Sequence, residues 1–141
     1  MSSIAFHVAE DIKLPIKNKS AYRQWILDTA KTEQKSIDFI NYIFCSDEYL
    51  KDINVKYLNH DYYTDIITFP YREDGVLQSD IYISVDRVAD NAKEYGVPFE
   101  DELRRVMIHG LLHLIGYDDH EERDIAVIRT KEDFYICAFP E

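Results

Sequence analysis

The chain has few glycines and prolines, which interrupt helices and strands, and few cysteines, which form disulfides or bind metals. It contains four Gly, four Pro and two Cys among 141 residues. Cys45 and Cys137 lie far apart in sequence and form neither a zinc-type nor a redox motif, which favours a reducing cytoplasm. No apolar run approaches the ~18 residues of a membrane span, and no charged-then-apolar leader opens the sequence. We therefore expect a soluble, cytoplasmic protein with no membrane partner.

Positive charge is also scarce. Lys and Arg number 16 against 27 Asp and Glu, a formal net charge of -11. This balance argues against nucleic-acid binding by bulk electrostatics, which needs clustered cations, and DNA is not an expected partner. A local positive side could still form from cations of the first quarter of the chain, although ordinary solvated charge explains them equally well. These are Lys13, Lys17, Lys19, Arg23, Lys31 and Lys35.

Apolar and aromatic residues are abundant. Hydrophobic residues make up 46% of the chain and aromatic residues 13%, so a disordered chain is not expected. The length predicts a single domain over residues 1–141.

Hydrophobic periodicity predicts an α+β fold, a mixed sheet of about four strands packed by about five helices. The hairpin composition of Arg72–Gly75 predicts that the last two strands are antiparallel neighbours. Strands are expected over 4–8, 36–44, 64–69 and 77–84. Helices are expected from Ser20, from Ser46, from Ser84, from Phe99 to Gly116, and as a short polar segment over 121–131 before an aromatic tail.

Residues 109–120 carry the strongest chemical signal. His109 and His113 are four residues apart on the predicted central, buried helix, so both imidazoles can reach one metal ion. Gly116 is a helix stop, after which Asp119 and His120 follow at once. Imidazole and carboxylate ligands that leave a fourth position for water are typical of a catalytic zinc site. We predict one zinc ion at the end of this helix.

The segment has other interpretations. A histidine on an apolar helix is more often a packed core residue, but three histidines and two aspartates within twelve residues favour a metal, with iron, nickel or manganese as alternatives to zinc. Gly110 stands where metalloproteases of the His-Glu-x-x-His type carry their glutamate, which disfavours peptide hydrolysis. A zinc-activated water could attack a phosphodiester instead. Arg105, one turn before His109, could hold a phosphate or pair with Asp101 or Glu102.

The sequence resembles the YbeY family of bacterial zinc-dependent endoribonucleases. The family pattern His-Gly-x-Leu-His-Leu-x-Gly-Tyr-Asp-His is matched at every specified position over residues 109–118. Further family elements correspond to 53–54, 57–58, 64–69 and 79–81, so the resemblance spans residues 37–125. It implies an α+β fold with a metal cleft beside the sheet and cleavage of single-stranded RNA. It also implies maturation of the 3′ end of small-subunit ribosomal RNA and ribosome quality control, with the small subunit and assembly proteins as partners.

Two positions depart from the family pattern. The third family histidine falls on Asp119, with His120 one residue later, so we predict a site of His109, His113 and Asp119, with His120 as the alternative third ligand. The family arginine after the upstream tyrosine is Leu58 here. Either Arg72 or Arg105 substitutes for it, or activity is weak.

The leading hypothesis is a metal-dependent endoribonuclease with His109, His113 and Arg105 at its catalytic centre. Asp65 and Asp80 are candidates for the general base. Two alternatives remain: a non-catalytic ribosome-assembly factor stabilised by its metal, and a metal hydrolase of another substrate.

Overall fold

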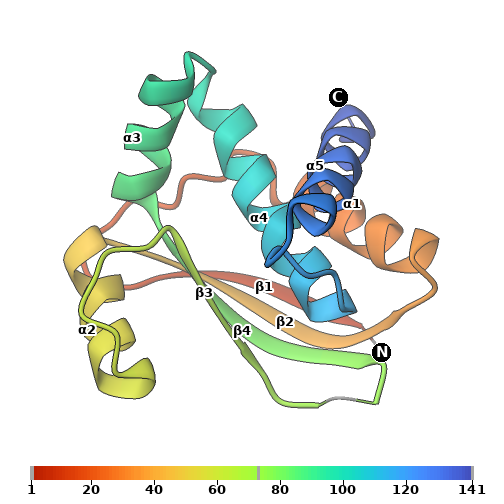
Figure 1. Ribbon diagram of the computed structural model, residues 1–141, viewed down its shortest axis with the longest axis horizontal. Helices are drawn as coiled ribbons and strands as arrows, with labels where there is room; N and C mark the ends of the chain where they lie inside the picture. Colours follow the sequence, from red (N-terminus) through yellow and green to blue (C-terminus); the bar gives the residue numbers. More distant parts are fainter. Residues whose placement is uncertain (1, 73, 141) are drawn as a thin grey trace.

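A computed structural model describes residues 2–72 and 74–140 and has the predicted α+β architecture (Figure 1). The described chain forms four strands and five helices. In order they are β1 (Ser3–Val8), α1 (Lys19–Thr32), β2 (Ser36–Cys45), α2 (Asp47–Leu58), β3 (Ile66–Pro70), β4 (Val76–Ser84), α3 (Val85–Tyr95), α4 (Phe99–Ile115) and α5 (Glu122–Cys137).

The sheet is mixed, with strand order β1-β2-β4-β3. β1, β2 and β4 are parallel, whereas β3 runs antiparallel to β4, as the hairpin composition predicted. Alternation along β2 and β4 sends one set of side chains to a single face, where Ile40, Tyr42, Phe44, Ile81 and Ile83 have no exposed surface. This face is the floor of the main core.

Helices cover the two faces of the sheet unequally. The main core joins the sheet to α1, α4 and α5, and α4 runs across the sheet beside α5 and α3 (Figure 1). A smaller cluster on the opposite face packs Leu50 and Ile53 of α2 against Cys45 and Ile67. No helix in the described parts of the chain combines the length and the apolar character needed to cross a bilayer.

Gly110 lets α4 approach the sheet closely. A Cβ atom there would lie 2.6 Å from Ile66 Cδ1 and 3.5 Å from Ile81 Cγ2. The absence of a side chain therefore seats the histidine-bearing helix directly on β3 and β4, next to the residues that open β3.

Three predicted boundaries were wrong. The first helix is capped by Asn18, whose side chain accepts a hydrogen bond from the Ala21 N–H, rather than by Ser20. β3 begins at Ile66 instead of residue 64. The last helix is not a short segment over 121–131, because α5 continues through the aromatic tail to Cys137. Packing against α1 stabilises this longer helix, because Tyr135 is only 3% exposed and its carbonyl accepts a 2.7 Å hydrogen bond from Trp25 Nε1.

Candidate metal centre

One turn of α4 places His109 and His113 side by side. Their side chains are about one-third exposed, and their Nε2 atoms are 3.0 Å apart. The helix ends at Gly116, whose φ of +125° is accessible to glycine and strained for other residues. The chain then turns back, so that Asp119 Oδ2 lies 3.3 Å from His113 Nε2 and 3.7 Å from His109 Nε2. The structure thus brings together the three residues that the sequence predicted as ligands.

The geometry of these three atoms suits a metal ion. Tetrahedral zinc with bonds of 2.0–2.2 Å holds neighbouring donors about 3.3–3.6 Å apart, close to the observed triangle of 3.0, 3.3 and 3.7 Å. Two imidazoles and a carboxylate are a donor set that zinc accepts. His109, His113 and Asp119 could therefore hold a metal ion.

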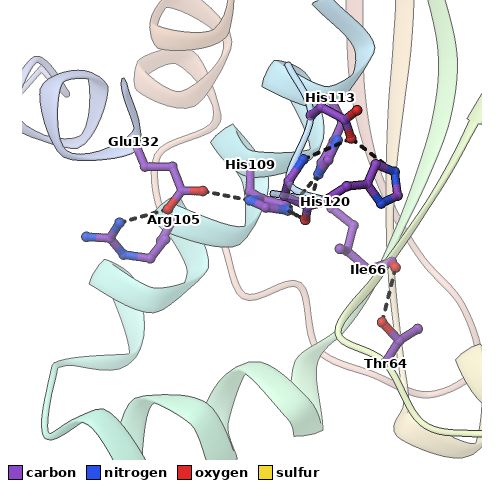
Figure 2. Close-up of polar contacts among 9 residues, drawn as sticks. Thr64, Ile66, Arg105, His109, His113, His120 and Glu132 are labelled. Atoms are coloured by element: carbon purple, nitrogen blue, oxygen red, sulfur yellow. Dashed lines mark hydrogen bonds and ion pairs between the residues drawn. The ribbon is translucent and has the colours of Figure 1, made fainter. Parts of the chain in front are cut away.

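Glu132 of α5 supports the first histidine and was missed by the sequence reasoning. His109 Nδ1 lies 2.6 Å from Glu132 Oε2, and the Glu132 side chain is only 5% exposed (Figure 2). Donation from Nδ1–H to the carboxylate leaves Nε2 with its lone pair facing Asp119 and His113. Burial acts to lower the pKa of His109, but the hydrogen bond and charge of Glu132 outweigh it and raise that pKa above its ordinary value.

Arg105 is held by acidic residues of α5. Its Nη1 donates to Glu132 Oε1 at 2.8 Å (Figure 2). Its Nη2 donates to Asp133 Oδ1 at 2.7 Å. The pairing alternative for this arginine is therefore realised, although with these two carboxylates instead of Asp101 or Glu102. Its role with a phosphate stays a prediction.

His120 does not join the two helical histidines in a group of candidate ligands among the described residues. Its side chain is 82% exposed, and its Nε2 atom is 3.1 Å from Asp118 Oδ1. Asp118, Asp119 and His120 form a second group that could hold a metal, but all three are exposed and Asp119 belongs to both groups. Of the two candidates for the third ligand, Asp119 is the one that the structure places beside His109 and His113.

The loop that carries Asp119 is anchored at Tyr117. The Tyr117 hydroxyl donates a 2.6 Å hydrogen bond to Glu33, which follows the end of α1. Tyr135 and Lys131 of α5 donate to the same carboxylate. Burial acts to raise the pKa of Glu33, and the three donors together hold it below its ordinary value. No spacing in the sequence indicated this network, because its members come from α1, the loop and α5.

Two recesses adjoin the histidines. The larger, about 670 Å³, is lined by His109 and Asp119 and by six carboxylates in all, and is here called the acidic cleft. The smaller, about 420 Å³, is lined by His113, Lys35 and Arg72 among others, and is here called the basic groove. The carboxylates of the acidic cleft are Asp65, Asp101, Glu102, Asp119, Glu132 and Asp133.

The two candidate general bases are separated by the sheet. Asp65 lines the acidic cleft, and burial raises its pKa despite the opposing charge of His109. Asp80 alternates with the core residue Ile81 along β4 and so faces away from the metal centre, where Asn41 and Tyr71 donate hydrogen bonds to it. Only Asp65 lies near the histidines.

Comparisons with known proteins converge on one family. The model of a family described as Endoribonuclease YbeY matches residues 6–139. Proteins named Endoribonuclease YbeY from Flavobacterium johnsoniae and Parabacteroides distasonis are 46% and 42% identical to the chain. The first alignment covers 92% of this chain and 93% of the relative, the second 99% and 97%. The solution structure of a Thermotoga maritima protein superposes with a TM-score of 0.66 at 29% identity, over 94% of this chain and 86% of that one.

Proposed function

The chain belongs to the endoribonuclease YbeY family, and from that membership and the metal centre we propose that it is a zinc-dependent endoribonuclease acting on single-stranded RNA. The observation that carries the proposal is the donor triangle of His109, His113 and Asp119, whose spacing fits a tetrahedral ion with one position left for water or substrate. The residues of this triangle also line two recesses, of about 670 and 420 Å³.

Each residue of the centre has a proposed role. His109, His113 and Asp119 hold the metal, and Glu132 orients His109 through its Nδ1 atom. A bound zinc ion would lower the pKa of a coordinated water and neutralise charge that develops on the phosphate. Asp65, which lines the acidic cleft together with His109 and Asp119, is assigned as the proton acceptor, and burial raises its pKa above its ordinary value.

The finer biological assignment rests on the family resemblance. We propose that the substrate is ribosomal RNA and that the reaction matures the 3′ end of the small-subunit RNA in the cytoplasm. The small ribosomal subunit and its assembly proteins would then be the partners.

The decisive experiment combines metal analysis with RNA cleavage. Purified wild-type protein is expected to carry one zinc ion and to cleave a single-stranded ribosomal RNA fragment, but not the same fragment annealed to its complement. His113→Ala should lose zinc and lower the cleavage rate by more than about 100-fold. Loss of a residue that only supports a metal ligand lowers activity by at most about 100-fold. His7→Ala, an exposed histidine on β1, is the matched control and should behave as wild type.

A second candidate function is a non-catalytic ribosome-assembly factor. Leu58, at the position of the family arginine, ends α2 and lines neither recess, and the chain carries a net charge of -11. Zinc bound without metal-dependent cleavage, in preparations free of contaminating nuclease, would favour this function and contradict the first.

A further inference from the structure

The basic groove lies between the β3–β4 hairpin and the end of α4. Thr68 and Arg72 line it from the hairpin side, Lys35 from the segment after α1, and His113 from the metal centre. We propose that this groove is a phosphate-binding subsite, in which Lys35 and Arg72 contact the RNA backbone on one side of the scissile bond. The proposal rests on the proposed function and names the path of its substrate.

Charge separates the groove from the other recess. The described residues that line the groove include two cations and no Asp or Glu, whereas six carboxylates and only two cations, Arg105 and Arg129, are among those that line the acidic cleft. On a chain with a net charge of -11, a groove free of described acids beside the metal ligands is the favourable place for a polyanion. Backbone phosphates would be repelled from the cleft and attracted to the groove.

The candidate ligands of the metal centre are divided between the two recesses. His113 lines the groove, while His109 and Asp119 line the acidic cleft. A strand lying in the groove therefore brings one phosphate to the histidines while its next phosphates lie near the two cations. Contacts to phosphates are expected on one side of the cleaved bond only.

Arg72 is more available than Arg105 to contact a phosphate. Two carboxylates hold Arg105, and one of them, Glu132, is buried and also bound to His109. Arg72 pairs only with Asp74, two residues away in the exposed hairpin, among the partners that the structure describes. Exposed ion pairs are weak, so Arg72 can exchange this carboxylate for a phosphate.

Lys35 is fixed at the rim of the groove by its backbone. Its N–H donates a 2.8 Å hydrogen bond to the Ala30 carbonyl at the end of α1, directly after Gln34 in a left-handed conformation with φ of +61°. The half-buried side chain then lines the groove opposite the hairpin. Two cations from distant parts of the sequence thus converge on one recess.

The test is the salt dependence of RNA recognition by the zinc-loaded protein. In Lys35→Gln/Arg72→Gln, KM for single-stranded RNA should rise about 10-fold or more with kcat within about two-fold, and the slope of log KM against log salt should fall by about 1.4, or about 0.7 for each lost phosphate contact. Lys56→Gln/Lys93→Gln removes the same charge from exposed positions on α2 and α3 and should leave the slope unchanged. Asp74→Asn should lower KM by releasing Arg72.

Outcomes for the groove and for the enzyme are separable. Equal slopes for the two double variants would overturn the phosphate subsite while wild-type cleavage upheld the endoribonuclease. If the wild-type protein cleaves nothing, the proposed function fails, and fluorescence anisotropy with the same labelled RNA still decides the groove: a smaller salt slope for Lys35→Gln/Arg72→Gln than for the control supports it, and equal slopes or no binding overturn it.

Discussion

His109 has two ring nitrogens with different partners. Nδ1 is committed to the buried carboxylate of Glu132, 2.6 Å away, which leaves Nε2 as the nitrogen that can face a metal. Without that carboxylate the imidazole could rotate or adopt the other tautomer, and it would then present a proton instead of a lone pair to the centre. The supporting residue is therefore part of the metal site, although it need not touch the ion.

Glu132→Gln should weaken zinc binding by about 10-fold, because the neutral amide can still accept from Nδ1–H but no longer raises the basicity of the ring. The measurement is competition for zinc against a chelator of known affinity. Asp133→Asn removes the other carboxylate bound to Arg105 and serves as the control, with an expected affinity near wild type. Equal losses in both variants would show that the Arg105 ion pairs, and not Glu132 itself, support the site.

Local sequence identified the candidate ligands but not the residue that supports them. The four-residue spacing of His109 and His113 and the stop at Gly116 are local features, and the register with the family pattern selected Asp119. Glu132 follows His109 by 23 residues and reaches it only because α5 packs against α4. A contact of this kind leaves no period in the sequence.

The loop after α4 is held in place at its start, by Gly116 and Tyr117. Gly116 ends the helix at one side, and Tyr117 is tied to Glu33 before the chain reaches Asp119. Because Glu33 also accepts hydrogen bonds from Tyr135 and Lys131, the loop is connected both to the end of α1 and to α5.

Tyr117→Phe should lower zinc affinity several-fold, since the loop loses its tether and Asp119 spends less time beside the histidines. Tyr135→Phe removes a hydroxyl from the same carboxylate without touching the loop and should leave zinc affinity near that of wild type. Isothermal titration of zinc into the metal-free proteins measures both. Similar zinc affinities in Tyr117→Phe and in wild type would contradict the role of the tether, whatever the change in thermal stability.

Hydrophobic periodicity predicted most helices and strands but not the full length of α5. The polar surface of residues 121–131 suggested a short helix, yet Ile128, Glu132 and Tyr135 are the buried residues of α5 and recur at helical spacing. The stripe is hard to recognise because one of its members is a glutamate, whose burial depends on His109 and Arg105.

At the scale of the molecule, the fold of this acidic chain forms two recesses of different charge beside one metal centre. The acidic cleft is lined by carboxylates from the segment before β3, from α4, from the loop after α4 and from α5. The basic groove is lined by Lys35 and Arg72. The sequence allowed for a local positive side but could not locate it. Lys35 precedes β2 and Arg72 lies in the β3–β4 hairpin, and the pairing of Ser36 with Val76 between β2 and β4 brings these two segments together. The proposed path of an RNA strand therefore depends on the whole fold.

The central claim is that His109, His113 and Asp119 together hold the metal on which cleavage depends. It is tested most directly by measuring bound zinc and RNA cleavage in Asp119→Ala beside His120→Ala, both prepared as the wild type. We predict that Asp119→Ala loses both zinc and activity, whereas His120→Ala keeps one zinc ion per chain and cleaves at a rate near wild type. Loss of zinc and activity in His120→Ala alone would contradict the account.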